Sequence, residues 1–440
     1  MRGPLLVVTI GCLFGFASSQ IGTAEDSPIK DGTPAGSRNS APQPAGNTEF
    51  LIGAAFQHEN LTIFPILSKT PRNSDRFITL DEGLKAHTVE IREMGAHVDR
   101  PLSRAADGRL IVQRANSQRQ VENRSNRPAQ NSSPNPQFDE LVNDAAASEA
   151  ALSPRQNDVN QLVVVNRSDK PLYLMPGEVI VGGSQDRTIG EEVTIAPTGK
   201  PVAIAVFCVE PERWSPRGAQ ESARTLQSLN RAQIAGEAPI PVDQGSLHKF
   251  VATPGSLNKR GRKAVQSGDS QGAVWDEVRT INRKLGAETR SGAFTANYVN
   301  EKTQRKSQAY LDDLAAHVSH EDRVVGVVVV VNGKIESADV FESTPLFRKL
   351  WPKLLKGYVL DALSAAHAKP PAKTCQVADA ATFLATILQG AVSETKHTKG
   401  GLVVTHRETR AGVSYSASSG KMKGGMDGMG GALHSAGYAP

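Results

Sequence analysis

The chain has 440 residues, of which 39% are hydrophobic, 5% aromatic and 22% charged. This hydrophobic content is sufficient for a core, but the small aromatic share indicates that segments without a core dilute a smaller folded part. Basic and acidic side chains nearly balance, at a formal charge of +5, which argues against the basic stripe of a nucleic-acid-binding protein. We therefore expect no nucleic-acid partner.

The N-terminus has the pattern of an export signal. Arg2 precedes an apolar run at residues 5–17, and the small residues at 17–19 suit cleavage by a signal peptidase. The run is short for a membrane span, and polar sequence follows it. We predict that residues 1–19 are a signal peptide and that the exported protein (periplasmic, cell-surface or secreted) has no integral membrane span after cleavage. A retained N-terminal anchor is the alternative.

Composition divides the remaining chain into ordered and disordered parts. Residues 20–47 are dense in Pro, Gly and Ser, which predicts a disordered leader. Residues 48–408 carry the strand and helix patterns of one main domain, interrupted at about 95–158 by a predicted disordered insertion rich in Asn, Gln, Arg and Ser. Residues 409–440 are rich in Gly and Met and are predicted to be a disordered tail.

Short strands dominate the first half of the predicted domain. Three strand-like runs precede the insertion, and three more follow it, separated by tight turns that predict a β meander. A further strand pair surrounds a Pro-Thr-Gly turn. These segments are 61–67, 77–84 (a strand running into a short helix), 87–94, 162–165, 172–175, 178–181 and 193–210.

The second half has helical periodicity, with apolar residues three to four apart. Asn332–Gly333 indicates a β-hairpin, and Ser343 followed by Pro345 has the pattern of a helix start. The predicted helices are 218–235, 272–287, 300–318, 343–358 and 378–390; the hairpin is 323–341 and a last strand is 401–408. The predicted class is α+β, a mixed or antiparallel short-strand β meander packed with several helices and a late β-hairpin.

The helix after Ser343 carries a basic face. Arg348, Lys349, Lys353 and Lys356 lie away from its apolar stripe. We expect this face to be solvated, with a membrane or acidic-partner surface as the alternative.

The stretch PGEVIVGGSQDRT at residues 176–188 combines an apolar run with Gly182, Gly183, Asp186 and Arg187. It is compatible with a phosphate, metal or hydrolase site and with the turn of a β-hairpin. No predicted helix follows to present its N-terminus to a phosphate. Ser184 lacks the second glycine of a nucleophile elbow. We therefore predict a hairpin first and a site second. If the residues QDR at 185–187 have a chemical or binding role, we expect them to face the stretch CVEPERW at 208–214.

Charged and polar residues gather at the ends of these two strands. Arginine forks and backbone N–H groups there suit an anionic or sugar-like ligand. The alternative is a partly buried structural ion pair, Asp186–Arg213 or Glu210–Arg187. Both interpretations stay open. The candidate ligand-binding residues are Glu178, Gln185, Asp186, Arg187, Glu210, Arg213 and Trp214.

Two smaller groups have competing interpretations. Cys208 is expected to be a buried structural thiol, with a disulfide to Cys375 or a nucleophile as alternatives. His317 and His320, next to Glu321 and Asp322, suit either a divalent metal or the C-terminus of a polar helix. We expect the helix terminus, and we expect no cofactor or metal.

Four blocks of sequence resemble the ARG and rhodanese-phosphatase-superfamily-associated protein domain (ARPP family). They are NRSDKPLYLMPGEVIVGGSQDRT, FCVEPERW, GAVWDEV and VNGKIESADVFESTPLFRKLWPKLL. The resemblance covers most of residues 60–408. It implies a context of nucleotide or ADP-ribose metabolism without an established activity. The chain departs from the family pattern in its insertion at 95–158, its export signal and its Gly/Met tail.

Three hypotheses follow for the function. The leading one is an exported ligand-binding or interaction module whose partner is a small anionic ligand or an envelope protein. The second is a hydrolase of a nucleotide- or ADP-ribose-like phosphorylated substrate. In it, Asp186 or Glu210 is general acid/base and Arg187 or Arg213 stabilises anionic charge. The third is a structural envelope protein with no small-molecule ligand.

Overall fold

The computed structural model describes residues 43–46, 48–94, 160–234, 237, 239–240, 242, 250–320, 322–366, 374–398, 401–419 and 432–440. These residues all belong to one compact unit, Gly36–Pro440. The predicted signal peptide, the predicted insertion and most of the predicted leader lie outside them. No helix in the described ranges combines the length and the apolarity that a membrane span requires.

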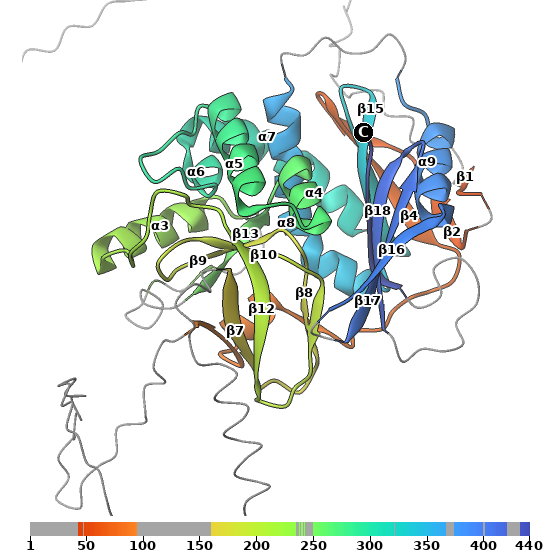
Figure 1. Ribbon diagram of the computed structural model, residues 1–440. Coiled ribbons are helices and arrows are strands. Elements are labelled where there is room, and N and C mark those ends of the chain that lie inside the picture. Colours follow the sequence, from red (N-terminus) through yellow and green to blue (C-terminus); the bar gives the residue numbers. More distant parts are fainter. Residues whose placement is uncertain are drawn as a thin grey trace, which may run out of the picture. The chain divides into compact units, whose positions relative to one another are not determined.

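The described residues form three sheets, of which the largest has ten strands (Figure 1). Its order is β1-β2-β4-β14-β15-β19-β18-β17-β16, with β3 paired to β4, and its described ladders are antiparallel. The bounds are β1 Gln43–Pro44, β2 Phe50–Ile52, β3 Phe56–His58, β4 Leu61–Ser68, β14 Val324–Val331, β15 Lys334–Phe341, β16 Val392–His397, β17 Leu402–Thr409, β18 Gly412–Ser419 and β19 Ala432–Tyr438.

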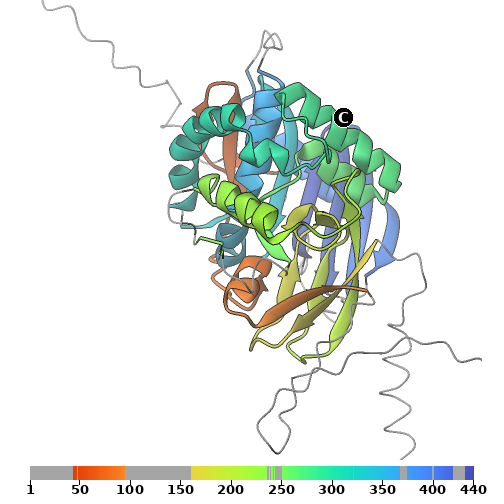
Figure 2. The ribbon, with the colours of Figure 1, turned by 90° about the vertical axis from the view of Figure 1, so that its left-hand side faces the viewer.

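Strand β14 is buried along its whole length, as its unbroken apolar sequence VVGVVVVV predicts. Val327 and Val329 pack into one hydrophobic cluster with helices α7 (Glu301–Ser319) and α8 (Thr344–Ser364). Val328 packs on the other face, in a cluster with α9 (Val377–Gln389). The alternation of side chains along a strand therefore places helices on both faces of the large sheet (Figures 1 and 2).

The other two sheets are a six-stranded sheet, of order β13-β9-β10-β12-β7-β6, and a three-stranded sheet, of order β11-β8-β5; their strands fall between residues 78 and 256. Val179 and Val181 of β9 face a cluster with helices α3 to α5, whereas Ile180 faces the three-stranded sheet. The bounds are β5 Ile78–Thr79, β6 Val89–Glu93, β7 Gln161–Asn166, β8 Leu172–Leu174, β9 Glu178–Val181, β10 Arg187–Ile189, β11 Val193–Ile195, β12 Pro201–Cys208 and β13 Val251–Ser256; the remaining helices are α1 Leu80–Lys85, α3 Ala219–Arg231, α4 Lys259–Ser267, α5 Gln271–Leu285 and α6 Ala296–Val299.

The α+β class and the late hairpin β14–β15 are confirmed. The strand pairing of the first half differs from a simple meander, because β7, β8 and β9 have other partners. In the described ladders β7 pairs with β6 and β12, β8 with β5 and β11, and β9 with β10 and β13. The successive strands β7, β8 and β9 thus do not pair with one another, and β8 lies in a different sheet from β7 and β9.

The expectation of a disordered tail from residue 409 is wrong for its two described segments. Strands β18 and β19 pair with each other, and β19 also pairs with β15 inside the large sheet. A side chain at Gly437 would place its Cβ 2.2 Å from Ile387 Cδ1 of α9. The small residues of these strands therefore permit close packing of α9, although they give little strand signal in sequence. Residues 420–431, which connect the two strands, lie outside the described residues.

The basic face of α8 is only partly solvated, contrary to expectation. Lys353 and Lys356 are buried, and each amine meets a carboxylate. Lys353 Nζ lies 2.7 Å from Glu178 Oε1, and Lys356 Nζ lies 2.6 Å from Glu237 Oε2. Helical spacing alone does not distinguish a solvated lysine from one that is paired inside a core.

A buried charge network around His434 ties β19 to the rest of the fold. His434 Nδ1 lies 2.9 Å from Glu192 Oε1, and Nε2 lies 3.0 Å from Asp339 Oδ1. The Arg262 guanidinium of α4 forms a bidentate pair with Asp339, and Tyr358 Oη donates to the same carboxylate at 2.5 Å. Two carboxylates around one imidazole favour its doubly protonated form. Burial alone would lower the pKa of His434, but Glu192 and Asp339 raise it to about 9.

This raised pKa predicts a loss of stability in alkaline solution. The unfolded imidazole titrates near 6.5. The network's stabilisation is therefore fully present below that pH and disappears as the pH rises through about 9. Between those values the wild-type protein should lose about 3 kcal/mol more unfolding free energy than H434Q does. Denaturant titrations across this pH range measure the difference. The control H397Q, at an exposed histidine, should keep the wild-type slope, and equal slopes for wild type and H434Q would refute the assignment.

Candidate functional site

The β9–β10 hairpin places Gln185 and Asp186 at its end. Arg187 pairs with Ile180 and Thr188 with Val179, so residues 182–186 form the connection. Gly183 has a φ of +54°, and a Cβ there would lie 2.5 Å from the Phe250 ring. Only glycine fits this turn without displacing that ring. The predicted hairpin of PGEVIVGGSQDRT is therefore present.

The chain after β12 folds back onto this turn. Val209 N donates to Asp186 O at 3.0 Å, and Asp186 N donates to Glu210 Oε2 at 3.1 Å. Farther along, Glu212 N donates to Ser291 O at 3.1 Å. The loop at 209–218 is thus held between the β-hairpin and the segment before α6, and the predicted facing of the two stretches is present.

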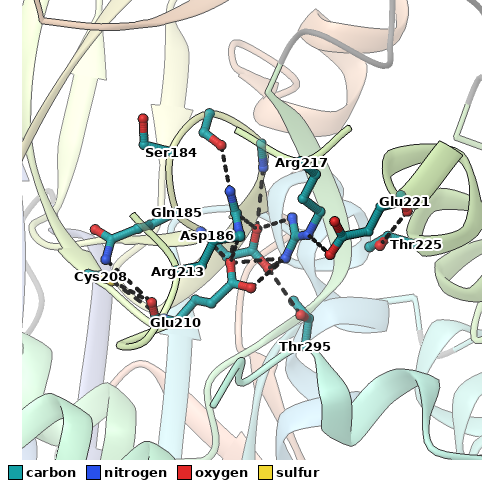
Figure 3. A network of polar contacts seen from close by, with 12 residues as sticks. Ser184, Gln185, Asp186, Cys208, Glu210, Arg213, Arg217, Glu221, Thr225 and Thr295 are labelled. Atoms are coloured by element: carbon teal, nitrogen blue, oxygen red, sulfur yellow. Dashed lines mark hydrogen bonds and ion pairs between the residues drawn. The ribbon is translucent and has the colours of Figure 1, made fainter. Parts of the chain in front are cut away.

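Two carboxylates and two guanidinium groups meet where these segments converge (Figure 3). Arg213 donates from Nε to Glu210 Oε2 at 2.8 Å and from Nη2 to Asp186 Oδ1 at 3.1 Å. Arg217 donates to both oxygens of Asp186, at 2.7 and 2.9 Å, and from Nη2 to both oxygens of Glu210 at 2.9 Å. Thr295 Oγ1 completes the coordination by donating to Asp186 Oδ2 at 3.1 Å.

These four charged side chains are almost entirely buried, with exposures of 0% for Asp186, 1% for Glu210, 9% for Arg213 and 7% for Arg217. Two carboxylates and two guanidinium groups stand against one another within the network. Burial by itself would lower the pKa of Arg217, but Asp186 and then Glu210 raise it above its usual range. The Arg217 guanidinium therefore stays cationic near neutral pH and lies against both carboxylates.

Arg217 was not among the candidate residues of the sequence. Charge balance could have indicated it: one arginine poorly compensates two buried carboxylates, so a second basic residue was needed near Arg213. The spacing of four residues after Arg213 lets both guanidinium groups approach the same pair of acids from one loop.

Glu178 lies outside this network. Its carboxylate accepts hydrogen bonds from Lys353 Nζ at 2.7 Å and from Met175 N at 2.9 Å. Burial raises the pKa of Glu178, and Lys353 opposes that shift only in part. Asp81 also contacts Lys353 at 2.7 Å. Glu178 thus joins β9 to α8 and α1 and does not contribute to the turn.

Arg187 comes directly after Asp186 in sequence but lies opposite Cys208, its partner in the β10–β12 ladder. Burial lowers the pKa of Arg187, and the nearby Cys208, Glu93 and Asp186 oppose this. Gln185 is buried as well: its Nε2 donates to Glu210 O at 3.4 Å, and its Oε1 has no hydrogen-bond partner among the described residues.

Trp214 is the exposed member of the candidate set. Its side chain is 59% exposed, and its ring meets Trp275 of α5 edge-on, with 6.5 Å between ring centres. The residues on both sides of Trp214 belong to the loop at 209–218, which the ion pairs hold in place. Arg213 Nη1 donates to Ser215 O at 2.8 Å and to Gly183 O at 2.7 Å. The loop therefore fixes the backbone around an exposed indole.

Cys208 carries a buried free thiol, so the alternative of a disulfide with Cys375 does not apply to this structure. The Gln271 side-chain amide hydrogen-bonds the Cys208 backbone twice: Oε1 accepts from Cys208 N at 2.8 Å, and Nε2 donates to Cys208 O at 2.9 Å. Burial raises the pKa of the thiol, and the Glu210 backbone and the Arg187 charge only partly offset this. A protonated, enclosed thiol is a poor nucleophile.

The two histidines at the end of α7, His317 and His320, have different surroundings and do not form one site. His317 stacks on Phe56 with 4.9 Å between ring centres, and its Nε2 lies 3.6 Å from Asp313 Oδ1. His320 is the C-cap of α7. Within the described ranges no group of three or more His, Cys, Asp or Glu side chains has an arrangement that suits a metal ion.

The arrangement limits the chemistry of the site. A general acid or base needs a carboxylate oxygen directed at a substrate, whereas the oxygens of Asp186 and Glu210 are taken by guanidinium, backbone and hydroxyl donors. An anionic ligand would have to displace one of these carboxylates from an arginine. The structural interpretation of the ion pairs therefore accounts for the geometry of these four residues.

One family model matches the chain, over residues 49–128 and 142–426; the family is described as the ARG and Rhodanese-Phosphatase-superfamily-associated Protein domain. The match includes the turn at 182–186 and the loop at 209–218. It also extends from both sides into the predicted insertion at 95–158. No curated protein and no solved structure matches the chain.

The ion-pair network predicts a large effect of removing one cation. R217M leaves two buried carboxylates to one arginine, and the unfolding free energy should fall by about 3–5 kcal/mol. The control R279M removes an arginine whose pair with Asp276 is solvent-exposed, so its effect should stay below about 1 kcal/mol. Denaturant unfolding of both variants measures the difference. An R217M protein as stable as R279M would show that the network does not hold the fold.

Proposed function

The chain belongs to the family of the ARG and Rhodanese-Phosphatase-superfamily-associated Protein domain, and on this premise we propose that it is a binding module that presents Trp214 to a protein partner. The observation that carries the proposal is the 59% exposure of this indole within a loop anchored by buried ion pairs. A tryptophan offers a large contact area and is enriched among residues that dominate binding energy.

Preorganisation supports this role. Arg213 closes the loop around Trp214 by donating to Ser215 O and Gly183 O, and Arg217 fastens the following residues to Asp186. A loop already held in one conformation loses little entropy when it binds. Trp275 contacts the indole from one side and leaves most of its surface to a partner.

The ion pairs of Arg213 and Arg217 indicate which class of partner the site suits. Because both guanidinium groups are committed to buried carboxylates, a small anionic ligand has no available cation in this network. An apolar contact with a protein surface needs none. The family description associates the domain with ARG and with the rhodanese-phosphatase superfamily, which supports an accessory role beside other proteins.

Export is a separate part of the proposal and rests on the N-terminal sequence alone. Arg2, the apolar run at 5–17 and the small residues at 17–19 support a signal peptide. In that case the partner is an envelope or secreted protein. The hydrolase hypothesis receives less support, because neither Asp186 nor Glu210 has an oxygen directed away from the network.

Crosslinking from position 214 tests the binding role. A photoreactive amino acid in place of Trp214 should give a discrete adduct in intact cells, whereas the same group in place of the exposed Glu301 should not. With the adduct protein purified, W214A should weaken its binding more than about thirtyfold, since a buried tryptophan anchor contributes about 2 kcal/mol or more. The melting temperature of W214A should stay unchanged because the indole is exposed.

Two results would overturn the proposal. One is the same adduct pattern from positions 214 and 301. The other is turnover of nucleotides or ADP-ribose derivatives by the purified protein that D186N abolishes while its fold is retained, since this would return the hydrolase hypothesis.

A further inference from the structure

Strand β16 ends the ten-stranded sheet on one side, and no described strand pairs with its outer edge (Figure 1). Its six residues, VSETKH at Val392–His397, are all exposed, including Val392 at 56%. An edge strand with unpaired backbone groups is a template for another strand. Its sequence therefore decides what can pair there.

The ladder with β17 determines which backbone groups point outward. Thr398 N donates to Leu402 O at 2.9 Å, so the backbone of residue 398 faces β17. Orientation alternates along an antiparallel strand. Glu394 and Lys396 therefore direct their backbone groups to β17, whereas Thr395 and His397 direct theirs to the outer edge.

The charges of this strand are complementary to themselves in one register. When two copies pair antiparallel about a two-fold axis at Thr395, Glu394 of each copy lies opposite Lys396 of the other. Axes at Glu394 or Lys396 instead place like charges directly opposite each other. Opposite charges in facing positions stabilise a strand pair, and like charges destabilise it.

Backbone geometry agrees with the same register. With the axis at Thr395, the two Thr395 residues exchange their outward N–H and C=O groups. Glu394 and Lys396 then occupy non-hydrogen-bonded positions, where facing side chains lie closest. Lys396 Nζ lies 3.9 Å from Glu191 Oε2, which is a weak contact, and its side chain remains 65% exposed. It is therefore accessible to a second carboxylate.

From these observations we propose that β16 is a self-association surface, on which a second copy of this chain pairs antiparallel about Thr395. The resulting interface is isologous, as in most homodimers. A single strand pair is small, and the bulge at Ser393 shortens it, so the dimer is weak and dependent on concentration and salt. This surface is separate from the Trp214 loop, and the two proposals stand independently.

Charge reversal and charge exchange test the register. Sedimentation velocity of the purified full chain should show a monomer–dimer equilibrium. E394K and K396E should each weaken it about tenfold or more, since each variant converts two attractive pairs into repulsive ones. The double variant E394K/K396E should restore wild-type association, because exchanging the two charges within the strand again places opposite charges in facing positions. E301K, on exposed α7, is the matched control and should leave the equilibrium unchanged.

A backbone variant tests the strand pairing itself. T395P removes an N–H that points away from β17, so the internal ladder stays intact while the outer edge loses its central donor. We expect a monomer with the wild-type melting temperature. A wild-type protein that stays monomeric at all concentrations, or a dimer that the double variant fails to restore, would overturn the proposal. W214A should show the same monomer–dimer equilibrium as the wild type in sedimentation. This result would show that failure of the β16 proposal and failure of the Trp214 proposal can be told apart.

Discussion

The mutual neutralisation of Asp186, Glu210, Arg213 and Arg217 is the interaction on which the candidate site depends. Isolated, each charge would be costly to bury, since several kcal/mol of hydration are lost per ion. Together they connect the β9–β10 turn, the loop after β12 and the segment before α6. The same contacts occupy the carboxylate oxygens, which supports our proposal that these acids hold the loop in place and do not act on a substrate. What the network leaves accessible is Trp214.

The His434 network follows the same principle elsewhere in the fold. It joins β19, near the end of the chain, to Asp339 of β15 and to Glu192 in the loop before β11. Buried polar groups of this kind specify which segments meet, because a mispaired arrangement would leave charges uncompensated. Both networks therefore link segments far apart in sequence. The difference is that one has a titratable imidazole, so its contribution depends on pH.

Local features of the fold could be predicted from the sequence, and nonlocal ones could not. An unbroken apolar run indicated β14, helical periodicity indicated α8, and the glycine pair indicated the β9–β10 hairpin. The turn facing CVEPERW was foreseen because strand ends carry the charges. The partner of Glu178 was missed, since Lys353 is distant in sequence and its helical position suggested solvent. β19 was missed because ALHSAGY has small residues whose burial comes from neighbours on both sides.

Whether the four buried charges act as one structural unit is measured most directly by a double-mutant cycle on Asp186 and Arg217. Unfolding free energies of the wild type, D186N, R217Q and the double variant give their coupling. Because these side chains share a buried bidentate pair, we expect a coupling above about 1 kcal/mol, with the double variant less destabilised than the sum of the singles. A coupling near zero, with D186N as stable as the wild type, would contradict the structural role and reopen a catalytic one.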